Sequence, residues 1–220
     1  MVDHVHLVEA SRRVKPKLRG WLHEIAFFVS IPAGITLIAL SAGAAKHVGA
    51  IVFAVSLSGL YGTSALYHRG RWTPQRERFM RHLDHSMIYV LIAGSYTPLT
   101  LLALRPAWGV TLLCLAWTGA IIGITITVLR LEQWSRLGGI LYIALGWLVV
   151  IALPQIVHSL DVREMTLLVA GGVLYTLGAV MFATKWPDPN PRVFGYHEIW
   201  HVFVVSAGAC HYALVLSLVR

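Results

Sequence analysis

The chain has 220 residues, of which 57% are hydrophobic and only 13% are charged, and its mean hydropathy is +0.68. This apolar content exceeds the roughly 45–50% that is usual in soluble domains, so the composition indicates an integral membrane protein. The formal net charge of +8 does not indicate a nucleic-acid partner, because the basic residues are divided among short connections and gather on no soluble surface.

Seven stretches of the chain offer the roughly 20 mostly apolar residues that a helix needs to cross a bilayer. They are residues 20–40, 48–67, 84–104, 107–129, 138–157, 165–183 and 197–219. We therefore expect an all-α protein, a bundle of seven transmembrane helices. Residues 1–19 are expected to form a basic tail and residues 20–220 a single membrane domain. The tail has no apolar core, so no cleaved signal peptide is predicted and the first span should direct insertion.

The distribution of basic residues predicts the orientation of these spans. Fourteen of the 18 lysines and arginines lie in the N-terminal tail and in alternate connections, against four on the other side. Because cytoplasmic connections are enriched in lysine and arginine, the N-terminus is expected in the cytoplasm and the C-terminus outside.

Prolines predict where the helices are interrupted. Pro32, Pro98 and Pro154 lie inside predicted spans, and each is expected to kink its helix where neighbouring helices can satisfy the freed carbonyl groups. Residues 186–195 contain three prolines and cannot be helical, so they are predicted to be the loop into the last span.

Ionisable residues gather at the predicted cytoplasmic ends of four spans. Such residues are costly at membrane depth and mark candidate functional sites. They are His23 and Glu24 in the first span, His68 in the second, Asp84 and His85 in the third, and His197, Glu198 and His201 in the seventh. Their convergence at one depth predicts a site at the cytoplasmic face.

The sequence HEIWH, from His197 to His201, places two imidazoles one turn apart on one helix face, where they can hold one metal ion. It also matches the H-E-x-x-H pattern of zinc hydrolases, although histidines near a helix end can simply lie in the headgroup layer. A third imidazole would complete a zinc site that keeps an open position for water. Spacing alone leaves four candidates: His23, His68, His82 and His85.

Two further residues are candidates for this site. Ser64 precedes His68 by one helical turn, so its hydroxyl is expected on the same face and about 6 Å deeper in the membrane. Serines in membrane helices also pack helices closely or bond to a carbonyl one turn earlier. Asp84 is expected to begin the third helix, where the helix dipole favours a carboxylate, and it can equally be the partner of a ligand histidine.

Three segments resemble the bacterial hemolysin III family: SALYH (residues 64–68), HLDHSMIYVLIAGSYTP (residues 82–98) and YHEIWHVFVVSAGACHY (residues 196–212). That family is similar to the progestin and adiponectin receptors and, more remotely, to the alkaline ceramidases. The resemblance implies a zinc ion bound by three histidines, with a serine and an aspartate close to it. Carried over to this chain, the resemblance implies His68, His197 and His201 as the ligands and Ser64 and Asp84 as their neighbours. It also implies a multi-pass protein of the bacterial cytoplasmic (inner) membrane.

The leading hypothesis for function is a zinc-dependent hydrolase of lipid amide or ester bonds, in which Asp84 positions or deprotonates the attacking water and Ser64 assists the oxyanion. The alternative is a non-catalytic membrane protein, a hemolysin in name only, whose structural or sensory zinc affects membrane lipid or energy homeostasis. A third hypothesis is an intramembrane zinc protease with Glu198 as the base. The expected partners are membrane lipids, including a lipid substrate, and not nucleic acid.

Overall fold

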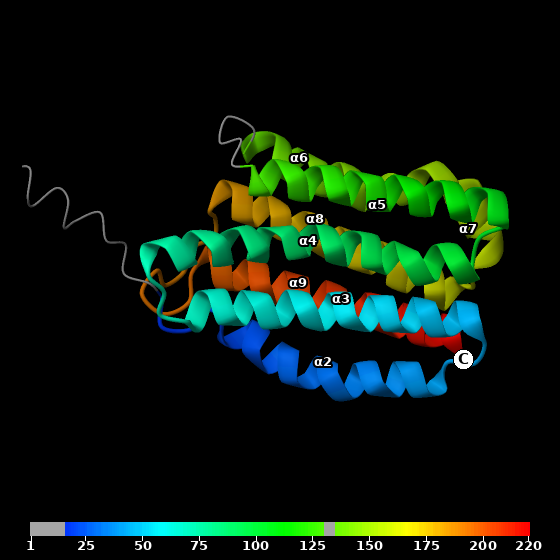
Figure 1. Ribbon diagram of the computed structural model, residues 1–220, viewed down its shortest axis with the longest axis horizontal. Coiled ribbons are helices and arrows are strands. Elements are labelled where there is room, and N and C mark those ends of the chain that lie inside the picture. Colours follow the sequence, from blue (N-terminus) through cyan, green and yellow to red (C-terminus); the bar gives the residue numbers. More distant parts are fainter. Residues whose placement is uncertain (1–15, 130–134) are drawn as a thin grey trace, which may run out of the picture.

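A computed structural model describes residues 16–129 and 135–220, and every regular element within these ranges is a helix. The helices are α2 (Trp21–Leu40), α3 (Ala44–Arg69), α4 (Pro74–Leu102), α5 (Pro106–Val128), α6 (Ser135–Gly146), η2 (Leu148–Ala152), α7 (Leu153–Ser159), α8 (Val162–Thr184) and α9 (Tyr196–Val219). The long helices run side by side as one bundle (Figure 1). The all-α prediction is confirmed for the described part of the chain.

Six segments within the described ranges are long and apolar enough to cross a membrane. They are Trp21–Leu40, Ala44–Arg69, Pro106–Val128, Gly139–Ser159, Val162–Thr184 and Tyr196–Val219. Large apolar side chains cover their outward faces; Phe28 and Ile35 of α2 and Val110 of α5 are all more than 60% exposed. A surface this apolar is suited to hydrocarbon and not to water, so the protein is a multi-pass membrane protein.

The helix α4 begins earlier than the sequence predicts. It starts at Pro74, after Thr73, whose side chain accepts a hydrogen bond from the backbone N–H of Arg76. Asp84 therefore lies ten residues inside α4, and the expectation that it begins and caps a helix is wrong. α4 is not among the six apolar segments, although it lies within the bundle and packs against α3 and α5 (Figure 1).

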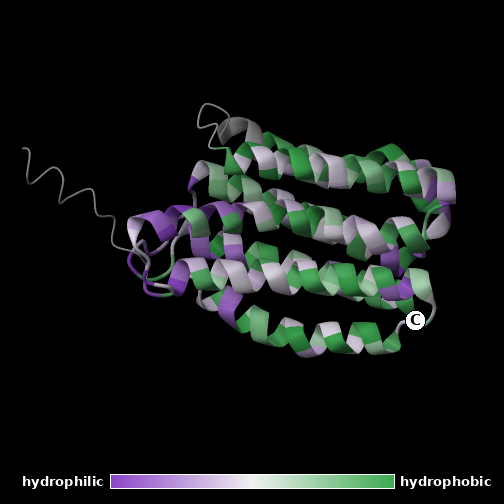
Figure 2. Ribbon diagram, in the orientation of Figure 1, coloured by the Kyte–Doolittle hydropathy of each residue, from purple (hydrophilic) through white to green (hydrophobic). Residues whose placement is uncertain are grey.

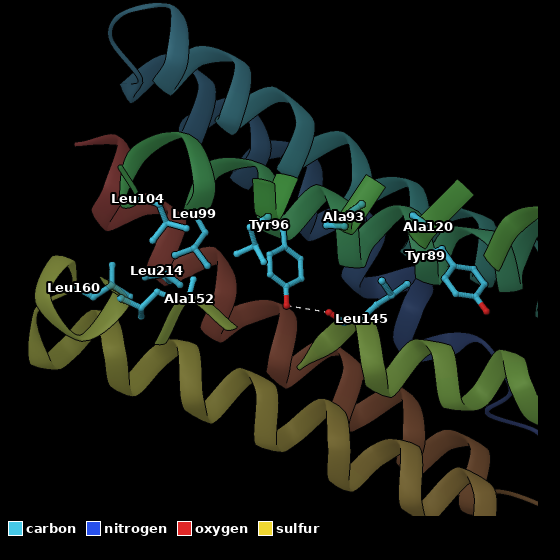
Figure 3. Packing of buried hydrophobic residues seen from close by; sticks show 13 residues of the cluster. Tyr89, Ala93, Tyr96, Leu99, Leu104, Ala120, Leu145, Ala152, Leu160 and Leu214 are labelled. Carbon is cyan, nitrogen blue, oxygen red and sulfur yellow. Dashed lines mark hydrogen bonds between the residues drawn. The ribbon is translucent and has the colours of Figure 1, made fainter. Parts of the chain in front are cut away.

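The fifth predicted span is a broken helix. α6 ends at Gly146, and η2 and α7 complete the segment, with Pro154 in the first turn of α7. Tyr96 of α4 stabilises the break. Its hydroxyl donates to the carbonyl of Leu145 at 2.9 Å (Figure 3) and accepts the N–H of Val149 at 2.8 Å. Backbone groups that the break frees inside the membrane thus keep hydrogen-bond partners.

Two buried apolar clusters hold the bundle together. One joins α4, α5 and the α6–α7 segment, and Figure 3 shows part of it. The other joins α2, α3 and α9 through residues such as Leu37, Phe53 and Val215. This second cluster fixes the two helices, α3 and α9, whose ends carry the candidate metal ligands.

Hydrophilic residues are concentrated at the end of the bundle where α4 begins (Figure 2). The loop of residues 186–195 lies at this end and is non-helical, as its prolines predict. The other two prolines predicted to interrupt spans, Pro32 and Pro98, lie inside α2 and α4. The polar end is therefore the place where the chain can build a chemical site.

Candidate metal centre

Three histidines from two helices converge at the polar end of the bundle. His68 lies in the last turn of α3, and His197 and His201 lie in the first two turns of α9. One ring nitrogen of each lies within 4.8 Å of those of the other two, and the Nε2 atoms of His68 and His197 are 3.1 Å apart. Two nitrogen lone pairs this close repel each other unless a proton or a cation lies between them, so the group can hold a metal ion.

The surroundings of these three rings favour a fixed arrangement. His68 is 7% exposed and His201 is 2% exposed, while His197 is half-buried. The ring centroids of His197 and His201 are 4.8 Å apart, as expected for residues one helical turn apart. Of the four candidates that spacing left open for the third imidazole, the structure brings His68 into the group, whereas His23 stacks on His201 from outside it.

Ser64 and Asp84 form a polar pair next to this group. Ser64 is 3% exposed on α3, one turn before His68, and its hydroxyl makes a side-chain hydrogen bond with the carboxylate of Asp84 on α4. When Asp84 is ionised it can only accept hydrogen bonds, so the serine is then the donor. Ser64 thus links α3 to α4 directly.

Glu198, the second residue of HEIWH, is occupied by structural contacts. It is 3% exposed, one carboxylate oxygen pairs with the guanidinium of Arg19, and the other accepts the backbone N–H of Gly195 at 2.8 Å. A carboxylate whose two oxygens are both engaged is poorly placed to accept a proton from water. The structure therefore argues against the protease hypothesis, which needs Glu198 as the base.

A polar cleft adjoins the histidine group, and a separate apolar cavity lies between the helices. A polar cleft of about 840 Å³ is lined by His68, His197 and Asp84 together with charged residues such as Arg19 and Arg192. An apolar cavity of about 370 Å³ lies among α4, the broken α6–α7 segment, α8 and α9. The hydroxyl of Tyr142, which lines the apolar cavity, donates to the carbonyl of His85, which lines the cleft.

Arg19 is a residue of this site that its sequence position does not indicate. It lies in the basic N-terminal tail, but its guanidinium reaches Glu198, 179 positions away. No local pattern signals a pairing over such a separation. The one available hint is that Glu198, a carboxylate at predicted membrane depth, needs a cationic partner.

The structure thus defines a class: a helical, multi-pass membrane protein with a buried three-histidine group at one end of its bundle. Comparison with known proteins identifies the family. Residues 11–212 match the family described as Haemolysin-III related, and the chain belongs to that family.

Two bacterial relatives cover most of the chain. It is 39% identical over 200 residues to Hemolysin-3 of Bacillus cereus, covering 90% of this chain and 88% of that protein. It is 34% identical over 197 residues to the Hemolysin-3 homolog of Bacillus subtilis (strain 168), covering 88% and 89%. A more distant similarity, 26% identity over 222 residues, relates it to the human monocyte to macrophage differentiation factor, covering 94% and 87%. The expected family is confirmed.

Proposed function

We propose that this protein is a zinc-dependent hydrolase of amide or ester bonds in membrane lipids, with His68, His197 and His201 as the zinc ligands. The observation that carries the proposal is that two members of the three-histidine group, His68 and His197, line the same polar cleft as Asp84. Asp84 is outside the group of converging ligand atoms. Its carboxylate therefore remains available for acid–base chemistry.

The residues fit a catalytic zinc site better than a closed structural one. Catalytic zinc is commonly bound by three protein ligands and keeps one position open, whereas structural zinc has four protein ligands. Zinc bound here would supply a Lewis acid that polarises the scissile carbonyl and makes water more acidic. The cleft provides the aqueous access that hydrolysis needs.

The protein's own residues would manage the proton. Asp84 accepts a proton from the attacking water and then delivers it to the leaving amine or alcohol. Ser64 has a single hydroxyl proton, and by donating it to the ionised form of Asp84 it would orient the carboxylate. A role for Ser64 in stabilising the oxyanion requires this hydrogen bond to open during the reaction.

The two spaces match the two parts of a lipid substrate. The polar cleft can take the headgroup and the scissile bond, and the apolar cavity can take a hydrocarbon chain. A hydrogen bond between Tyr142 and His85 links the walls of the two spaces. Membrane lipids are therefore the proposed partners and substrates.

We also propose that the chain crosses the bacterial cytoplasmic (inner) membrane seven times, with α4 as the third span. Residues 20–220 would form one membrane domain and residues 1–19 a cytoplasmic tail. The place of α4 within the bundle supports a seventh span (Figure 1). The fourteen-to-four division of basic residues supports a cytoplasmic N-terminus, an external C-terminus and a site at the cytoplasmic face.

A lipid panel tests the proposed activity. Wild-type protein and His201→Ala are purified in bilayer particles, and fatty-acid release from lipid amides and esters is measured together with zinc on the same samples. We expect release by wild type and none by the variant. A wild-type protein that carries zinc but releases fatty acid from no lipid would favour the alternative of a structural or sensory zinc.

A further inference from the structure

The segment Arg19–His23 contacts both helices that carry the three-histidine group, although it supplies no member of that group. Gly20 makes the first contact. It has a left-handed conformation with φ +83°, and a Cβ placed on it would lie 2.8 Å from the Cβ of His68. Only glycine allows both this conformation and this approach. The start of α2 is thus pressed against the last turn of α3.

His23 makes the second contact, with α9. Its ring is stacked on that of His201, with centroids 3.8 Å apart and planes 9° from parallel. It is 3% exposed, and neither ring nitrogen has a hydrogen-bond partner among the described residues. Burying an imidazole without hydrogen bonds is unfavourable. The favourable contact that His23 makes here is therefore the stacking of its ring face on His201. The stacked ring restricts the rotation of the His201 side chain.

Arg19 makes the third contact, with the first turn of α9. Its guanidinium pairs with the buried carboxylate of Glu198, which lies between two ligand histidines in the sequence and also accepts the N–H of Gly195. Breaking a buried pair leaves an uncompensated charge, so the pair fixes this turn firmly. Glu198 thereby connects the turn that carries His197 to the start of α2.

Neighbouring contacts hold the segment in place. Glu24 pairs with Arg69, the residue after His68, and the Arg69 guanidinium lies 4.2 Å from the centroid of the Trp21 ring. Before the segment, backbone hydrogen bonds join Lys17 and Leu18 to the loop that precedes α9. Moreover, α2 packs more extensively against α3 and against α9 than these two helices pack against each other.

We propose that the Arg19–His23 segment is a positioning element for the metal centre. It sets the separation between the end of α3 and the start of α9, and it fixes the plane of the His201 ring. His23 and Glu198 are then positioning residues, the first through its aromatic face and the second through its ion pair, and neither is a ligand or a base. The proposal rests on metal binding by the three histidines and does not require turnover.

Two substitutions of His23 test the stacking contact. His23→Leu removes the flat ring, and His23→Phe keeps it while removing both nitrogens. Zinc affinity is measured by chelator competition, and the site geometry by the visible absorption of bound Co²⁺. We expect His23→Leu to weaken zinc binding about 10–100-fold, the usual effect of losing a residue that orients a ligand, and to change the Co²⁺ spectrum. His23→Phe should stay close to wild type.

Either of two results would overturn this role of His23. Wild-type affinity and spectrum in His23→Leu would show that the stacked ring is not needed. An equal loss in His23→Phe and His23→Leu would show that the nitrogens matter and that His23 is itself a ligand. The unfolding temperature of each metal-free variant is measured alongside, so that an unfolded variant is not read as a weak binder.

Glu198→Gln tests the ion pair, and Glu164→Gln is its matched control. Both glutamates accept the backbone N–H three residues before them, but Glu164 does so at the start of α8 and also accepts the hydroxyl of Ser217. We expect Glu198→Gln to weaken zinc binding at least about tenfold and Glu164→Gln to leave it unchanged. Unchanged binding in Glu198→Gln, or an equal loss in the control, would contradict the proposal. Both tests measure zinc binding and not hydrolysis, so their results do not depend on whether the protein has catalytic turnover.

Discussion

The Nε2 atoms of His68 and His197 lie 3.1 Å apart, although 129 positions separate these residues in the chain. The contact exists because α3 ends and α9 begins at the same end of the bundle (Figure 1). A shared proton could bridge these two nitrogens, but it would leave the nitrogen of His201, within 4.8 Å of both, unused. A metal ion can engage all three, and this is the basis of the first prediction.

Purified protein is expected to contain about one zinc per chain, and His201→Ala is expected to lose it, because two imidazoles bind zinc much more weakly than three. Metal analysis of both proteins checks this. His85→Ala is the matched control, since His85 lines the same cleft outside the three-histidine group and its loss should leave the zinc content unchanged. Full zinc content in His201→Ala would show that this ligand is wrongly assigned.

Asp84→Asn is expected to lower any lipid hydrolysis by about 10²–10⁴-fold, the range that a general base contributes, while most of the zinc stays bound. Asparagine keeps the size of aspartate and can still accept the Ser64 hydrogen bond, but it cannot take up a proton. His197→Ala should lose both zinc and turnover. Fatty-acid release and zinc are measured on the same samples, and equal turnover by wild type and Asp84→Asn would remove Asp84 from the mechanism.

A reporter fused after Arg220 tests the proposed orientation. With seven spans and a cytoplasmic N-terminus, a reporter that works only outside the cytoplasm should be active there, and one that works only in the cytoplasm should be silent. The same pair of reporters fused within the loop of residues 186–195 should give the opposite result. Activity of the cytoplasmic reporter at Arg220 would show that the orientation is the reverse of the one proposed or that the chain has one span fewer.

Tyr96→Phe is expected to lower the free energy of unfolding by about 1–3 kcal/mol, because the part-buried N–H of Val149 loses its hydrogen-bond acceptor. Unfolding in detergent micelles measures the loss. Tyr212→Phe is the matched control, since its hydroxyl only donates to the carbonyl of Ala33 in α2 and its removal leaves no N–H unpaired. Equal stabilities of wild type and Tyr96→Phe would show that this hydroxyl does not stabilise the helix break.

Local patterns in the sequence predicted the parts of the site that lie on one element. HEIWH placed His197 and His201 on one face because a helical turn fixes that spacing, and hydropathy predicted the ends of most spans. Spacing could not select His68 among four histidines, because that choice depends on how α3 and α9 pack. The family resemblance selected it, and the structure brings it into the group.

The features that the sequence did not predict depend on distant residues or on charged helical turns. α4 extends ten residues before Asp84 in a charged stretch that hydropathy does not identify as helix, although Thr73 and Pro74 form a readable helix start. The break after Gly146 depends on Tyr96, about 50 positions earlier. Sequence periodicity carries no information on contacts of this kind.

Anomalous diffraction at the zinc absorption edge, with a count of the ligands, tests the central claim most directly, because it reports the metal, its site and its open position together. We predict one anomalous peak among His68, His197 and His201, with no fourth protein ligand and with Asp84 outside bonding distance. A peak elsewhere, or Asp84 bound as a fourth ligand at about 2.0–2.2 Å, would contradict the proposed catalytic zinc centre.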